Sequence, residues 1–107
     1  MLMAKMKITV FKRLDPKVVF GKNIPKRATG EEIPICERFQ DGQEFIIPME
    51  GSLTMPEGFC SWAWNDIYKD LSVLWYGGEF FGRGNMMWTC CTDGVRPVIF
   101  KLERLNK

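Results

Sequence analysis

One stretch of the chain carries a clear helical repeat, and this repeat limits the fold more than any other feature. Apolar residues recur three or four positions apart at Cys60, Ala63, Trp64, Ile67, Leu71, Leu74 and Trp75. This spacing is typical of an amphipathic helix that buries one face. Gly77 and Gly78 follow, and glycine commonly ends a helix. The sequence therefore predicts a helix over about residues 61–76. Its apolar face must pack against a second layer of the fold.

The other apolar segments have the composition of β-strands, because they are rich in β-branched and aromatic residues and end at turn-forming residues. They lie at residues 7–13, 43–47, 86–91 and 97–104. Asp93-Gly94 separates the last two segments, which predicts a tight hairpin with a type I′ turn. Pro97 then fits an edge strand, since proline has no N–H to donate.

Proline and glycine interrupt residues 15–34 repeatedly, which predicts loop with a short extended piece at residues 18–20. With 107 residues and 46% hydrophobic content, the chain can build one core. We predict a single domain over residues 1–107, with residues 1–6 disordered. The predicted fold is α+β: a small, mainly antiparallel sheet against one long helix, with the first strand and the C-terminal hairpin at its centre.

Charge and hydropathy limit the partners. The chain has 15 basic and 13 acidic residues, and the resulting +2 is too small to favour nucleic acid or an anionic membrane. No apolar run approaches the roughly 18–20 residues that span a bilayer, and the first residues lack a signal-peptide core. We therefore predict a cytoplasmic protein. Exposed sheet edges and surplus aromatic residues favour a homodimer, and a small-molecule ligand stays unidentified.

Four cysteines and the absence of histidine define the available chemistry. Without histidine the chain has no Ser-His-Asp or Cys-His catalytic unit and no histidine-bearing metal site. Cys36, Cys60, Cys90 and Cys91 come from three separate regions and form no Cys-x-x-Cys knuckle. Cytoplasmic thiols are normally reduced. We therefore treat these four residues as a candidate metal or redox site, and zinc or an iron–sulfur centre would suit the sulfur ligands.

Their positions add two constraints. Cys90 and Cys91 are neighbours on a predicted strand, so their side chains should point to opposite faces unless a bulge intervenes. Cys60 precedes the predicted helix, whose N-terminus favours an anion and can make a thiol reactive. The alternative is that each cysteine only packs as a small apolar side chain.

Other polar and aromatic residues of this region have simple structural interpretations. Asp66 and Asp70 lie one turn apart on the polar face of the predicted helix, which predicts that both are solvated. Trp62 lies off the apolar stripe and should pack against a loop or a partner chain. Asp93 is explained by its turn, and Arg83 lies in a glycine-rich loop without the context of a phosphate-binding loop.

Several motifs occur together over residues 5–105. They are Cys36 with Phe39, Gly42-Gln43-Glu44-Phe45, Gly58-Phe59-Cys60, Trp62-Ala63-Trp64 with Asp66-Ile67, and Cys90-Cys91-Thr92-Asp93-Gly94 with Arg96-Pro97-Val98. The chain thereby resembles a family of small bacterial and archaeal proteins with a Cys…GQ-x-F…GFC-x-WAW…CCTDG-x-RPV pattern. Members often have proline after the first cysteine, where this chain has Glu37. The resemblance implies that the four thiols form one pattern, but it implies no activity, cofactor or partner.

Three functions remain open at this point. The first is a small cytoplasmic cysteine-site protein that binds zinc or an iron–sulfur centre, or cycles a dithiol. The second is a non-enzymatic binding or interaction module whose cysteines are packing residues. The third is an enzyme with Cys60 or Cys91 as the nucleophile and a carboxylate as the base. The absence of histidine argues against this enzyme, because its usual activating base is missing.

Overall fold

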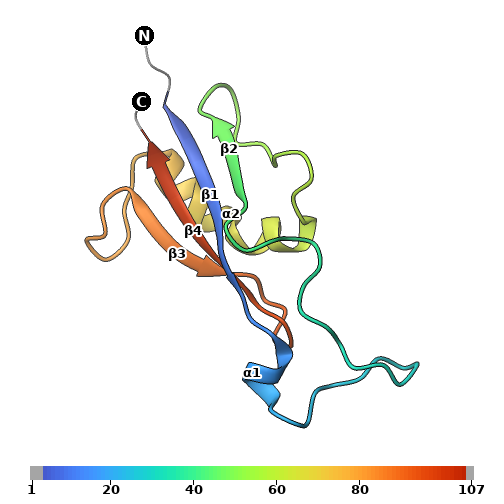
Figure 1. The fold of residues 1–107 in the computed structure, drawn as a ribbon. Coiled ribbons are helices and arrows are strands. Elements are labelled where there is room, and N and C mark those ends of the chain that lie inside the picture. Colours follow the sequence, from blue (N-terminus) through green and yellow to red (C-terminus); the bar gives the residue numbers. More distant parts are fainter. Residues whose placement is uncertain (1–3, 106–107) are drawn as a thin grey trace.

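The computed structural model describes residues 4–105, which form a four-stranded sheet with one main helix behind it (Figure 1). The elements are β1 (Lys5–Arg13), α1 (Pro16–Phe20), β2 (Glu44–Pro48), α2 (Ser61–Trp75), β3 (Met86–Cys90) and β4 (Val98–Leu105). The strand order is β2-β1-β4-β3, and every neighbouring pair is antiparallel. The predicted α+β class is confirmed, and so is the central position of the first and last strands. The other strand of the hairpin, β3, lies at the edge.

The core lies between α2 and one face of the sheet. Alternate residues of the two central strands are buried there, as period-two alternation requires. They are Met6, Ile8 and Val10 of β1 and Val98, Phe100 and Leu102 of β4. The helix contributes Ala63, Ile67, Leu71 and Leu74. The predicted stripe is therefore confirmed along its middle, while Trp64 and Trp75 pack half-buried against the core.

The first strand begins earlier in the chain than expected. Residues 1–6 were expected to be disordered, yet Lys5 and Met6 belong to β1 and pair with β2 and β4. Met6 is 0% exposed because its side chain alternates with Ile8 and Val10 on the core face. The expectation is wrong for these two residues, and residues 1–3 lie outside the described part of the chain.

The predicted extended piece at residues 18–20 is wrong, because these residues end the short helix α1. The Asp15 carboxylate accepts a hydrogen bond from the Lys17 N–H at 2.9 Å and caps this helix. Pro16 occupies its first turn, where a missing N–H costs nothing. Asp15-Pro16 thus starts a helix as well as ending a strand.

The hairpin exists, but its predicted type I′ turn is wrong. That turn needs positive φ at both central residues, and among the described residues neither Asp93 nor Gly94 has one. Instead the Asp93 carboxylate accepts the N–H groups of Val95 at 3.1 Å and Arg96 at 3.4 Å. This side-chain bonding supports a longer connection over residues 91–97. The edge position expected for Pro97 is also wrong, since this residue directly precedes the central strand β4.

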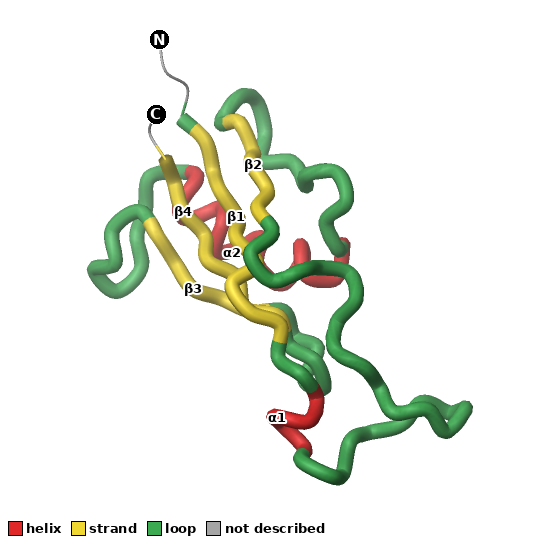
Figure 2. The backbone as a smooth tube through the Cα atoms, viewed as in Figure 1, coloured by secondary structure: helices red, strands yellow, loops and turns green. Residues whose placement is uncertain are grey.

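A long loop connects α1 to β2 and reaches away from the sheet before it returns (Figure 2). It contributes to an elongated molecule of 54 × 29 × 20 Å. The returning part carries Cys36, Arg38 and Phe39. No helix within residues 4–105 has the length and apolar character needed to cross a membrane.

Candidate functional site: a three-cysteine pocket

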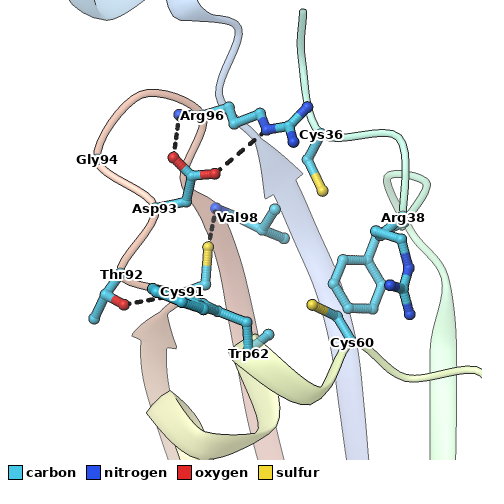
Figure 3. A pocket seen from close by; sticks show the side chains of 12 residues that line it. Cys36, Arg38, Cys60, Trp62, Cys91, Thr92, Asp93, Gly94, Arg96 and Val98 are labelled. Carbon is cyan, nitrogen blue, oxygen red and sulfur yellow. Dashed lines mark hydrogen bonds and ion pairs between the residues drawn. The ribbon is translucent and has the colours of Figure 1, made fainter. Parts of the chain in front are cut away.

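A pocket of 480 Å³ opens where the returning loop, the start of α2 and the connection after β3 meet (Figure 3). Cys36, Cys60 and Cys91 line it, one from each of these segments. Figure 3 shows the side chains of Cys36 and Cys60 directed into the same space. We call this site the three-cysteine pocket. It unites three of the four cysteines that the sequence singled out.

Cys90 does not line this pocket. It pairs with Ile99 at the end of β3 and is exposed, whereas Cys91 is only 8% exposed. The predicted opposite orientation of the two neighbours is therefore confirmed, and Cys91 is the one that turns inward. A site that uses all four thiols would need Cys90 to leave the strand geometry.

Cys91 is held by the backbone around it. The Val98 N–H donates a hydrogen bond to its Sγ atom at 3.3 Å, and the Cys91 N–H donates to the Val98 carbonyl at 3.1 Å. Burial raises the pKa of the Cys91 thiol, although hydrogen bonds from the Asp93 and Val98 backbone act against this change. Cys91 is therefore a neutral thiol at neutral pH.

Cys60 occupies the N-cap of α2, as its place in the sequence predicted. Its side chain makes no capping hydrogen bond, and the residue is partly exposed. The first turn of α2 contains no acidic residue. The Cys60 sulfur therefore lies at the positive end of a 15-residue helix without a carboxylate of that turn beside it.

Two contacts fix the loop that carries Cys36. The Arg13 guanidinium donates to the Cys36 carbonyl at 3.0 Å and also pairs with Asp41 at 3.1 Å. The backbone and side-chain hydrogen bonds from Arg13 lower the pKa of the Asp41 carboxyl. These bonds tie the loop to the end of β1.

Phe39 anchors the same loop in the core, where it is 2% exposed. Its ring centroid lies 5.0 Å from that of Phe59 and 5.3 Å from that of Phe100. Aromatic pairs at such distances stabilise a core beyond simple burial. Phe39 could not be predicted as a core residue, because its packing partners Phe59 and Phe100 are distant in sequence.

A second cluster holds the connection after β3 against α2. The Trp62 indole N–H donates to the Thr92 hydroxyl at 2.9 Å, and the Thr92 N–H donates to the Asp66 carboxylate at 2.7 Å. The expectation that Trp62 meets a loop is confirmed. The expectation of a merely solvated Asp66 is wrong. Its position one turn after Trp62 was the available signal, since residues four apart share a helix face.

Asp70 was also expected to be solvated, and this expectation is wrong because the residue is only 6% exposed. The helix contacts both β3 and β4, so it buries a wider face than the apolar stripe indicated. Asp70 pairs with the exposed Lys69 at 3.8 Å and does not line the three-cysteine pocket.

Two arginines line the pocket besides the thiols. Arg96 pairs with Asp93 at 3.3 Å, and its guanidinium also reaches the Pro34 carbonyl at 3.5 Å. Arg38 is exposed and has no ion-pair partner within residues 4–105. Arg38 could not be singled out from the sequence, because it belongs to none of the recognised motifs.

The sulfur atoms share a pocket without forming a ready metal site. Across residues 4–105, no three His, Cys, Asp or Glu side chains stand close enough together to hold one ion. A metal bound by Cys36, Cys60 and Cys91 would therefore require their side chains to move. Free thiols that line one pocket can instead react with each other or with a small molecule.

Comparisons with protein-family models, curated proteins and solved structures found no match. The resemblance to the small bacterial and archaeal family stays a prediction. The function must therefore be argued from the pocket and its residues.

Proposed function

We propose that this chain is a cysteine-site protein that cycles a dithiol in the three-cysteine pocket. The observation that carries this proposal is that Cys36, Cys60 and Cys91 line one pocket although they lie far apart in the sequence. Reactive cysteines are typically partly exposed and lie in electropositive surroundings. Cys36 and Cys60 are partly exposed, and two arginines share their pocket.

The three thiols differ in ways that suggest different roles. Cys60 is the attacking thiol in this proposal, because it lies at the positive end of α2 and its sulfur is not used for capping. Cys36 is the resolving thiol, since it is accessible and lies in a loop rather than in a strand or helix. Cys91 is buried and stays protonated, so it supports the pocket without exchanging.

Disulfide mapping tests this assignment. The protein would be oxidised with diamide, digested without reduction and analysed by mass spectrometry. We expect a Cys36–Cys60 disulfide in the wild-type protein and in a Cys90→Ser variant, which is the matched control because Cys90 lies outside the pocket. We expect no such bridge in Cys36→Ser or Cys60→Ser. Oxidation that yields only intermolecular Cys90 bridges would contradict the proposal.

A soft-metal centre is the second candidate, because a dithiol uses two of the thiols whereas the pocket gathers three. Zinc and iron–sulfur centres take thiolate ligands, and zinc sites with three protein ligands keep an open position. Anaerobic titration with Co²⁺ gives sulfur-to-metal charge-transfer bands if the thiolates bind. Here Cys91→Ser should abolish the bands and Cys90→Ser should retain them. Absence of bands in every variant rejects this candidate.

If both tests fail, we infer that the protein is a non-enzymatic binding module, because its cysteines would then be packing residues.

We also propose a reducing compartment, the cytoplasm, as the location. Four free cysteines support this proposal, since disulfides form and persist mainly in oxidising compartments. Acid quenching of cells, followed by alkylation under denaturing conditions that expose Cys91, would test it, with four modified cysteines as the expected result.

A further inference from the structure

We propose that the three-cysteine pocket selects small disulfides that carry a carboxylate, and that Arg38 binds this carboxylate. The inference rests on the proposed dithiol function and adds the class of substrate. A volume of 480 Å³ falls within the range of small-molecule sites. It therefore suits a small disulfide better than a folded protein.

The charges around the pocket favour an anion. Arg38, Arg96 and Asp93 are its charged lining residues. The charge of Arg96 is directed at Asp93, at 3.3 Å. Arg38 is the positive charge that remains for a ligand, and guanidinium groups bind carboxylates through paired hydrogen bonds.

Two further groups near Arg38 bear on its availability. Glu37 and Asp41 line a neighbouring hollow that Arg38 also borders. Asp41 is bound by Arg13 at 3.1 Å, and neither acidic residue lines the three-cysteine pocket. The N-terminus of α2, at Cys60, adds further positive potential to the pocket.

The reaction consumes one small disulfide and two protein thiols. The Cys60 thiolate attacks one sulfur of the disulfide, the sulfur–sulfur bond breaks, and the first half leaves as a thiolate that takes up a proton. The Cys36 thiolate then attacks the Cys60 sulfur and releases the second half as a thiol. The protein ends with a Cys36–Cys60 bond, oxidised by two electrons, and the small disulfide is reduced to two thiols.

Three disulfide probes of different charge test the selectivity. They are the anionic dithiobis(nitrobenzoate), the neutral dithiodipyridine and the cationic cystamine. Rates of Cys60 modification would be measured by mass spectrometry in full-length protein that carries Cys90→Ser, so that the exposed thiol does not contribute. Arg38→Gln is then compared with Arg27→Gln, an equal charge change at an exposed loop residue outside the pocket.

We expect Arg38→Gln to slow the anionic probe about threefold or more at low salt, because a nearby charge raises the encounter rate of an oppositely charged ligand. The neutral probe should react at an unchanged rate, and the cationic probe should not slow. Arg27→Gln should leave all three rates unchanged, and the Arg38 effect should shrink in high salt.

The alternative outcomes are separable. Equal slowing of all three probes, or no slowing of the anionic one, overturns the role of Arg38 while the dithiol chemistry stands. If Cys60 reacts with none of the probes, or no Cys36–Cys60 bond follows, the proposed function itself fails. Circular dichroism of Arg38→Gln checks the fold, which should be unchanged because this side chain is exposed.

Discussion

Burial separates Cys91 from the three other thiols, and this difference predicts an order of reactivity. Cys90 is exposed, Cys36 and Cys60 are partly exposed, and Cys91 is buried with a raised pKa. Only the thiolate reacts rapidly with alkylating reagents. Timed alkylation with iodoacetamide, followed by peptide mass spectrometry, should therefore modify Cys91 last. Modification of Cys91 as fast as Cys90 in the folded protein would contradict the structure.

The same thiol predicts a dependence of stability on pH. Its pKa is raised in the folded state, so the folded protein retains a proton that the unfolded chain releases as the pH passes the ordinary thiol value of 9.0. The stabilising contribution is complete below that pH and is lost as the pH rises through the folded pKa. Urea unfolding should show a larger loss between pH 7 and pH 10 for the wild type than for Cys91→Ala. Equal losses would refute the prediction.

At the scale of single residues, the sequence predicted the directions of side chains better than the contacts that these side chains make. The opposite directions of Cys90 and Cys91 follow from backbone geometry alone, so they could be predicted. The bonding of Asp66 to Thr92 depends on a contact between the helix and a distant connection, which no local pattern encodes. The meeting of Cys36, Cys60 and Cys91 in one pocket likewise depends on contacts between segments that are distant in sequence, so no local pattern predicts it.

At the scale of elements, Asp66 joins α2 to the connection that carries Cys91. Its carboxylate accepts both the N–H of Thr92 at 2.7 Å and the Thr92 hydroxyl at 3.1 Å. Asp66→Asn should lower the free energy of unfolding by about 1 kcal/mol, as expected for a lost charge-assisted bond at a partly exposed site. It should also speed alkylation of Cys91, because the connection loosens.

Asn65→Ala is the matched control for this change. Asn65 is the exposed neighbour of Asp66 on α2, and such surface substitutions usually alter stability by less than about 0.5 kcal/mol. Urea denaturation and alkylation rates should therefore stay near those of the wild type. If Asn65→Ala speeds alkylation of Cys91 as much as Asp66→Asn does, the hydrogen bonds between Asp66 and Thr92 are not what protects Cys91.

Elements that many residues specify were predicted well, and elements that depend on one or two residues were not. The periodic stripe of α2 extends over several turns and fixed its extent closely. The helix α1 is so short that one cap and one proline decide it, and the same two residues also suit the end of a strand. The prediction of a type I′ turn at Asp93-Gly94 was wrong because Asp-Gly occurs in more than one kind of turn. Here the Asp93 carboxylate accepts hydrogen bonds from the N–H groups of Val95 and Arg96.

At the scale of the whole molecule, the helix covers one face of the sheet and leaves aromatic residues on the other. Trp88 pairs with Lys101, whose strand neighbours Phe100 and Leu102 are buried, so Trp88 lies on the open face. Phe11 is 56% exposed and stacks edge-on against Trp88 at 4.8 Å. The expectation of a homodimer therefore has a specific surface to test.

Light scattering after size-exclusion chromatography should give the mass of a dimer for the wild type. Phe11→Ser should shift the protein toward the 12.4 kDa monomer, because it removes exposed apolar surface from the open face. Tyr76→Ser is the control, since Tyr76 is even more exposed to solvent than Phe11 but follows α2 on the other side of the sheet. A wild-type protein that is monomeric at every concentration would refute the homodimer.

The strand β2 occupies the stretch of chain between Cys36 and Cys60. A bond between these two cysteines would enclose this edge strand in a covalent loop, and such closure removes about 3 kcal/mol of chain entropy from the unfolded state. Opening of the strand would become rarer on oxidation, and hydrogen exchange of its amides would slow. The redox state of the three-cysteine pocket would then determine how often this edge strand opens.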